Sequence, residues 1–72
     1  MKTLVWQRKS RIDDHEWDLS LTNGRLNLWR DSFAIATAYG GRSIEWMKIA
    51  WPDEIVVAWR EMLDAMKKEE MR

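Results

Sequence analysis

The chain has 72 residues, which is enough for one domain with a small core. Twelve Lys and Arg balance twelve Asp and Glu, so the formal net charge is zero, and a strongly electrostatic nucleic-acid binder is disfavoured. Cysteine is absent, which excludes a disulfide framework and a thiolate metal site. No apolar run approaches the roughly 20 residues of a membrane span, and the N-terminus lacks the pattern of a signal peptide. We expect a soluble, cytoplasmic protein.

Residues 2–11 are expected to form the first strand, in which successive side chains point to opposite sides. Leu4, Trp6 and Arg8 share one side of that strand, and the residues between them take the other. The polar stretch IDDHEWD follows and is interpreted as a loop.

The stretch LSLTNGRLNLWRD, residues 19–31, carries the strongest local signal in the chain. An Asn-Gly pair between alternating apolar residues predicts a tight hairpin, because both turn residues take a positive φ. A two-residue turn sets the register, which pairs Leu21 with Leu26, Leu19 with Leu28, and Trp17 with Arg30. The four leucines then share the core face with Trp17, and Trp29 takes the opposite face with Asp18, Ser20 and Asn27.

Residues 32–50 fit either a strand or a helix. A strand is favoured for SFAIATAY, since its β-forming side chains share one face, although Asp31 would N-cap a short helix that ends at Gly40. GGR is expected to be a turn, and SIEWMKIAW a strand that ends at Trp51 before the proline.

The last element is a helix that begins at Pro52 and runs over 52–70. Acidic residues occupy its first turn and basic residues its end, as the helix dipole favours. Its apolar stripe follows helical spacing: Ile55, Trp59, Met62 and Met66, widened by Val56 and Leu63. Met66 and Met71 are expected to lie beyond the reach of a small sheet. A dimer or partner contact is therefore expected on this helix, with core packing as the alternative, at Trp59, Met62 and Met66.

These elements predict an α+β fold. The order is β-β-β-β-α: an antiparallel meander of about four strands over 2–51 and one C-terminal helix over 52–70, in a single domain. One helix covers only one face of a sheet, so the other face is expected to be solvated or to bind a partner. Six Trp are more than so small a chain encloses, and some of them should be partly exposed.

No pattern of catalytic residues occurs. The cluster Asp13, Asp14, His15, Glu16 and Asp18 contains residue types that bind divalent ions, but adjacent residues of a strand point to opposite sides. A solvated loop is the favoured interpretation. The Gly40-Gly41-Arg42 turn is interpreted as a plain hairpin turn rather than a phosphate site. We therefore expect neither an enzyme nor a bound metal or cofactor.

Aromatic and Arg residues on the predicted sheet are the remaining candidate site. Bases stack on aromatic side chains, and Arg binds phosphates. The expected contacts to a nucleic acid or another partner are Arg8, Arg25, Trp29, Arg30, Phe33 and Arg42. The alternative is an ordinary sheet surface with cation–π pairs such as Trp17–Arg30.

The motifs NGRLNLWRDSF and GGRSIEWMKIAWPDEIVVAWREML resemble the positive cofactor four family of transcriptional coactivators over residues 19–66. The resemblance implies a curved four-stranded sheet, a homodimer packed through the C-terminal helix, and single-stranded DNA bound in channels of the sheet. By position it assigns DNA contacts to Arg25, Arg30, Phe33 and Arg42. The chain departs from the family where Thr22 replaces an aromatic residue, where the glycine before the Ile strand is missing, and in its few lysines.

Two functions are therefore expected. The first is a non-enzymatic, dimeric module that binds single-stranded nucleic acid and regulates transcription or replication. The alternative is a small protein of the kind that phages make to inhibit host transcription or defence machinery by protein–protein binding. The neutral charge and the many Trp residues favour the alternative, and the sheet with its Arg and aromatic residues favours the first.

Overall fold

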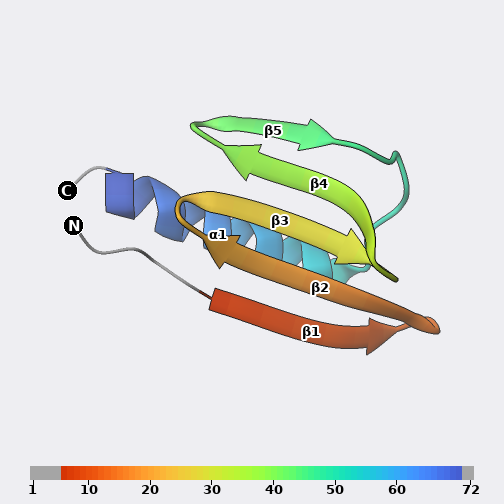
Figure 1. The fold of residues 1–72 in the computed structure, drawn as a ribbon. Coiled ribbons are helices and arrows are strands. Elements are labelled where there is room, and N and C mark those ends of the chain that lie inside the picture. The colour runs from red at the N-terminus through yellow and green to blue at the C-terminus, as the bar shows by residue number, and fades with distance from the viewer. Residues whose placement is uncertain (1–5, 71–72) are drawn as a thin grey trace.

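Five antiparallel strands and one helix make up the fold (Figure 1). The computed structural model describes residues 6–70, with only the backbone described at 69 and 70. The elements are β1 (Trp6–Ile12), β2 (His15–Thr22), β3 (Arg25–Arg30), β4 (Phe33–Tyr39), β5 (Arg42–Glu45) and α1 (Asp53–Glu70). The strands form a meander in the order β1-β2-β3-β4-β5. The predicted α+β meander with a C-terminal helix is confirmed, with five strands. Residues 2–5 of the predicted first strand lie outside the described residues.

Each strand is joined to the next by a two-residue turn in which both residues have positive φ. Asn23 and Gly24 form such a turn with φ of 51° and 75°, as the Asn-Gly signal predicted. The other three turns are Asp13–Asp14, Asp31–Ser32 and Gly40–Gly41. The stretch IDDHEWD is therefore no loop: it turns in two residues and enters β2 at once. Turns of this hand match the right-handed twist of the strands, so a meander follows.

The predicted register of β2 and β3 is confirmed. Leu21 pairs with Leu26 and Leu19 with Leu28, and all four leucines are buried on the face that α1 covers. Trp17, also buried, pairs with Arg30, and Trp29 lies on the opposite face. These leucines form the centre of the core with Ile35 of β4 and with Ile55, Ala58 and Trp59 of α1.

Helix α1 begins one residue after the predicted start, and the carbonyl of Pro52 accepts hydrogen bonds from the N–H groups of Ile55 and Val56. Met66 is only 7% exposed and belongs to the core, as does Trp59, while Met62 packs partly buried against it. The expectation that Met66 lies beyond the reach of the sheet is wrong: the helix is long, but it runs along the strands. Met71 lies outside the described residues. Over the described residues, no helix combines the length and the apolarity needed to cross a bilayer.

The last strand is shorter than predicted. β5 ends at Glu45, and residues 46–52 form no strand, so the sheet does not continue to Trp51. A β-bulge at Ile35 explains this, since Leu28 pairs with Ala36 while Trp29 pairs with Ala34. The N–H groups of Trp46 and Met47 both donate to the carbonyl of Ile35, at 2.8 and 3.3 Å, and the chain leaves the ladder there.

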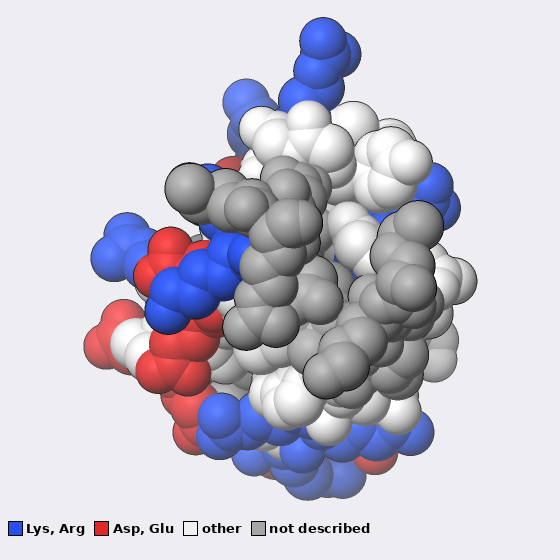
Figure 2. Space-filling model, turned by 90° about the vertical axis from the view of Figure 1, so that its left-hand side faces the viewer, with Lys and Arg blue, Asp and Glu red and all other residues white. Residues whose placement is uncertain are grey.

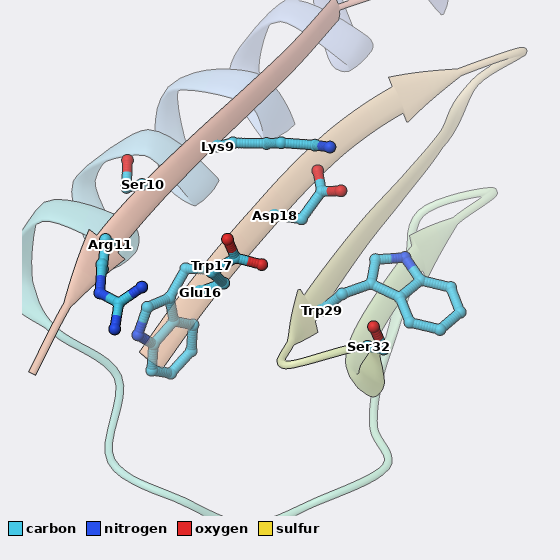
Figure 3. Close-up of a pocket in the computed structure, with 8 residues that line it drawn as sticks. All are labelled: Lys9, Ser10, Arg11, Glu16, Trp17, Asp18, Trp29 and Ser32. Atoms are coloured by element: carbon cyan, nitrogen blue, oxygen red, sulfur yellow. The ribbon is translucent and has the colours of Figure 1, made fainter. Parts of the chain in front are cut away.

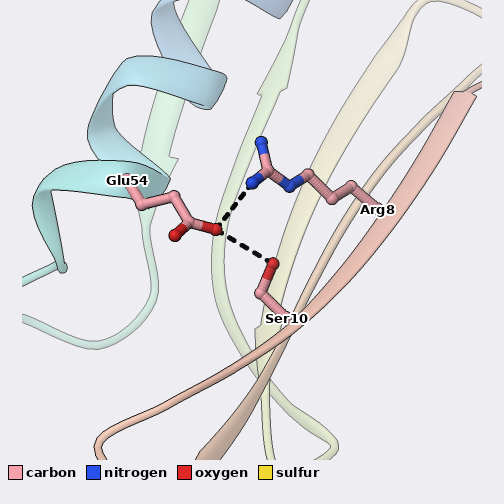
Figure 4. A network of polar contacts seen from close by, with 3 residues as sticks. All are labelled: Arg8, Ser10 and Glu54. Carbon is pink, nitrogen blue, oxygen red and sulfur yellow. Dashed lines mark hydrogen bonds and ion pairs between the residues drawn. The ribbon is translucent and has the colours of Figure 1, made fainter.

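The edge strand β1 is tied to the start of the helix (Figure 4). Arg8 forms an ion pair with Glu54 of α1 at 2.6 Å, and the hydroxyl of Ser10 donates to the same carboxylate oxygen at 3.2 Å. Both partners of the ion pair are about half exposed, so the contact orients the helix more than it stabilises the fold.

Two turn residues generate a stability prediction. Asp14 and Ser32 have φ of 64° and 70°, at a cost of about 1–2 kcal/mol for a residue with a side chain. Because glycine avoids this cost but loses more chain entropy on folding, Asp14→Gly and Ser32→Gly should each raise the free energy of unfolding by about 0.5–1 kcal/mol. Denaturant titration measures the change. The matched control is Ser43→Gly in β5, which should lower it; a decrease in all three variants would contradict the turn argument.

Candidate functional site

The sheet face turned away from α1 is not covered by any described element (Figure 1). We call it the outer face. On β3, β4 and β5 it carries a set of residues that we call the aromatic patch: Arg25, Asn27, Trp29, Thr37, Tyr39, Arg42, Ile44 and Trp46. Four large apolar side chains of this patch are exposed: Trp29 by 39%, Tyr39 by 58%, Ile44 by 50% and Trp46 by 58%. Exposed apolar side chains that cluster in this way mark binding surfaces.

Cross-strand pairing arranges the patch in rows. One row joins Arg25, Tyr39 and Arg42, where the Arg25 guanidinium carbon lies 5.1 Å from the centre of the Tyr39 ring. The next row joins Asn27, Thr37 and Ile44. The register therefore places a Tyr between two cations, and the patch contains no acidic residue.

A chain of hydrogen bonds fixes Trp46 on the patch. Its indole Nε1–H donates to Oγ1 of Thr37 at 3.0 Å, and the Thr37 hydroxyl donates to Oδ1 of Asn27 at 3.3 Å. Because an indole N–H is only a donor, Thr37 accepts from Trp46 and has one proton left for Asn27. Trp46 lies outside any strand, so this chain holds the ring against the outer face.

The other half of the outer face, on β1 and β2, is charged and hollowed (Figure 3). A hollow of about 550 Å³, which we call the charged hollow, is lined by Lys9, Ser10, Arg11, Glu16, Trp17, Asp18, Trp29 and Ser32. Trp29 belongs both to this hollow and to the aromatic patch, so the two are continuous.

At the far end of the hollow, two turns are linked by His15 and Asp31. Nδ1 of His15 donates to Oδ2 of Asp31 at 2.5 Å, and the N–H of Glu16 donates to Oδ1 at 2.9 Å. The hydrogen bond from Glu16, then the one from His15, lowers the pKa of Asp31 below its ordinary value of 3.8. Asp31 thus ties the turn between β3 and β4 to the start of β2 and does not N-cap a helix, the alternative that the sequence left open.

The six residues predicted to bind a nucleic acid or partner do not form one surface. Arg25, Trp29 and Arg42 lie together on the aromatic patch. Arg8 is on the helix side in its ion pair with Glu54, and Arg30 lies over the Trp17 ring at 5.9 Å.

Phe33 pairs with Arg30 beside the turn and is 67% exposed. The other three exposed apolar residues of the patch were not predicted to be binding residues: Tyr39, Ile44 and Trp46. The register across the Gly40–Gly41 turn was the feature of the sequence that could have identified them, because it sets Tyr39 opposite Arg42. The expectation that some Trp are exposed is confirmed by Trp29 and Trp46.

The acidic cluster is dispersed by the hairpin. Asp13 and Asp14 form the turn, Glu16 and Asp18 lie on the outer face, and His15 bonds to Asp31. Within the described part of the chain, no three His, Asp or Glu side chains are placed to hold a metal ion.

Charge is divided between the faces although the total is zero. The outer face carries four bases, Lys9, Arg11, Arg25 and Arg42, against two acids, Glu16 and Asp18, which leaves two positive charges in excess. Figure 2 looks at the end of the molecule and shows the acidic side chains gathered at one side, with Lys and Arg at the lower and upper edges.

The Asp31 contacts generate a pH prediction. Because its pKa is lowered in the folded state, Asp31 contributes stability above pH 3.8, and this is lost as the pH falls through the lowered pKa. Asp31→Asn should therefore be less stable than the wild-type protein at about pH 6, and the difference should shrink towards about pH 2. Denaturant titration followed by Trp fluorescence measures both curves. A difference that stays constant over this range would contradict the assignment.

Comparison of the chain with protein-family models, curated proteins and solved structures found no match. The likeness to the positive cofactor four family therefore stays an expectation carried by the short motifs within residues 19–66. The function has to be argued from the geometry of the outer face.

Proposed function

We propose that the protein is a non-enzymatic module that binds single-stranded nucleic acid on its outer face. The observation that carries the proposal is the aromatic patch: three exposed aromatic rings and two Arg, without an acidic residue, on an open sheet. Successive unpaired bases stack on exposed rings, at about 1–3 kcal/mol per base, while Arg binds the phosphates. A role in transcription or replication follows the resemblance of the hairpin and helix motifs.

The arrangement of the aromatic patch in rows supports the binding of single-stranded nucleic acid. Tyr39 lies between Arg25 and Arg42, so a base on its ring has a cation on either side for the flanking phosphates. At the other end of the patch, Trp29 and Trp46 offer two further ring faces. A single strand lying across β3 to β5 contacts rings and cations together, as sheet-based single-strand binders require.

A second candidate function is a protein-binding effector, of the phage type, that inhibits host transcription or defence machinery. Ile44 is the observation that favours it, because a half-exposed aliphatic side chain within the patch has no stacking role. Trp, Tyr and Arg are also the residues most enriched in protein–protein hot spots.

The binding test uses two arginines, Arg42 of β5 and Arg30 of β3, that face opposite sides of the sheet. Arg42→Ala on the outer face should weaken binding of a labelled single-stranded oligonucleotide and reduce its salt dependence by about one phosphate contact. Arg30→Ala, the matched control, should leave binding unchanged, since Arg30 lies over Trp17 on the helix side. Fluorescence anisotropy at several salt concentrations measures both. Equal losses in the two variants would contradict the outer face as the site.

Trp29→Ala tests stacking separately from charge. It should weaken oligonucleotide binding about tenfold without changing the salt dependence, because an aromatic contact releases no counterions. Phe33→Ala is the matched aromatic control and should bind as the wild-type protein does, because Phe33 is exposed beside Arg30 on the other side of the sheet. No binding by the wild-type protein at about micromolar concentration in low salt would reject the nucleic-acid function and leave the protein-binding effector.

The protein is also proposed to be a homodimer that packs through α1, but with other residues of the helix at the contact than those expected from the sequence. Since Trp59 and Met66 are buried within one chain and Met62 and Leu63 pack against the core, the exposed large apolar side chain of α1 left for a partner copy is Val57. Sedimentation should show a dimer that Val57→Glu dissociates. A monomer at the highest attainable concentration would remove the dimer and leave the binding function unaffected.

A further inference from the structure

The charged hollow offers three kinds of contact in one place. Lys9 and Arg11 supply cations, Glu16 and Asp18 supply carboxylates, and Trp29 supplies an aromatic ring. At about 550 Å³ it lies within the usual range of small-ligand sites, about 300–1,000 Å³. A ligand that matches all three carries an anion, hydroxyl donors and a flat ring. A ribonucleotide unit has these groups in its phosphate, ribose and base.

The order of the three contacts follows from the strand pairing. Lys9 of β1 pairs with Asp18 of β2, and Asp18 pairs with Trp29 of β3. Neighbouring strands lie about 4.8 Å apart, so this row spans about 10 Å. Figure 3 shows the Asp18 carboxylate between the Lys9 side chain and the Trp29 ring. A nucleotide whose base stacks on Trp29 therefore has its sugar beside Asp18 and its phosphate towards Lys9.

The Asp18 carboxylate and the backbone of Glu16 are held in place before any ligand arrives. Nε2 of Gln7 donates to both oxygens of Asp18, at 3.1 and 3.2 Å. The backbone of Glu16 exchanges hydrogen bonds with Asp31: its N–H donates to Oδ1, and its carbonyl accepts from the Asp31 N–H. The ion pairs among the described residues are Arg8–Glu54 and His15–Asp31, so neither Asp18 nor Glu16 is neutralised by one there.

We infer that the charged hollow binds one ribonucleotide of a single-stranded RNA, and that RNA is preferred over DNA. The inference rests on the proposed function and names its nucleic acid. A carboxylate accepts a strong hydrogen bond from a ribose 2′-hydroxyl, whereas deoxyribose offers no donor at that position. Beside DNA the same carboxylates lose water without replacement, so they act against the wrong ligand.

The test compares oligonucleotides that differ only at the 2′ position. Labelled oligouridylate, oligodeoxyuridylate and 2′-fluoro oligouridylate of one length are titrated with the wild-type protein by fluorescence anisotropy. Oligouridylate should bind about tenfold more tightly than the other two, which corresponds to one charge-assisted hydrogen bond. The 2′-fluoro sugar is the sharp comparison, because fluorine cannot donate a hydrogen bond. Equal binding of 2′-fluoro oligouridylate and oligouridylate would overturn the carboxylate contact.

Variants of Asp18 and Glu16 test whether these side chains cause the preference for RNA over DNA. Asp18→Ala and Glu16→Ala should each bring the RNA-to-DNA affinity ratio closer to one, because each removes one acceptor for the ribose 2′-hydroxyl. Glu61→Ala, an exposed acid of α1 with the same change of charge, should leave the ratio at its wild-type value. Circular dichroism checks that each variant is folded. A ratio unchanged in Asp18→Ala and Glu16→Ala overturns the inference.

The outcomes separate this inference from the proposed function. Equal affinity for RNA and DNA, or tighter binding of DNA, rejects the ribonucleotide contact and leaves single-strand binding standing. Absence of binding to every oligonucleotide rejects both. Uridine 5′-monophosphate is added as a competitor: displacement at concentrations similar to those of the oligonucleotide would identify a site for a free nucleotide and reject the RNA strand as the ligand.

Discussion

The packing of α1 against the leucine face of β2 and β3 is the contact on which the rest of the structure depends. Leu19, Leu21, Leu26 and Leu28 are all buried, and they are buried together because the register of one two-residue turn places them on one face. A shift of that register by one residue would send the leucines to water and Trp29 to the core. The function argued for the outer face therefore depends on the Asn23–Gly24 turn.

One helix on a five-stranded sheet leaves a whole face uncovered, and the two halves of this face carry different types of residue. On β3 to β5 the outer face carries the aromatic side chains and two Arg without an acid, whereas on β1 and β2 it carries charges of both signs. Trp29 stands at the border of the two halves. A ligand that crosses this border meets a stacking surface on one side and hydrogen-bond acceptors on the other. A nucleic-acid strand suits this arrangement better than a flat apolar partner does.

Local signals in the sequence predicted most of the fold. The Asn23–Gly24 pair predicted the register of β2 and β3, and Pro52 with the apolar stripe that begins at Ile55 predicted the helix, although Met66 was expected to lie beyond the sheet and is buried. The bulge at Ile35 left no such signal, because an extra residue in β4 is decided by long-range packing. That bulge ends β5 and turns Trp46 onto Thr37.

The candidate site was predicted only in part for the same reason. Arg25, Trp29 and Arg42 were found from the strand pattern, but strand alternation alone does not say that Arg8 meets Glu54 on the helix side. Tyr39 and Trp46 depend on pairings across β4 and β5, which a single sequence does not supply.

Zero net charge is the strongest argument against a nucleic-acid ligand, and the fold weakens it. Electrostatic attraction between exposed charges falls off within about 8–10 Å at physiological salt, so a bound strand responds to the face that it touches more than to the whole chain. The acids of α1 lie behind the sheet, while the outer face keeps four bases against two acids. Both of these acids lie in the charged hollow. There a ribose 2′-hydroxyl would donate a hydrogen bond to a carboxylate that otherwise only repels the phosphates. A neutral chain with its charges sorted by face is thus compatible with a weak, stacking-dominated binder whose selectivity comes from the sugar rather than from the number of phosphates.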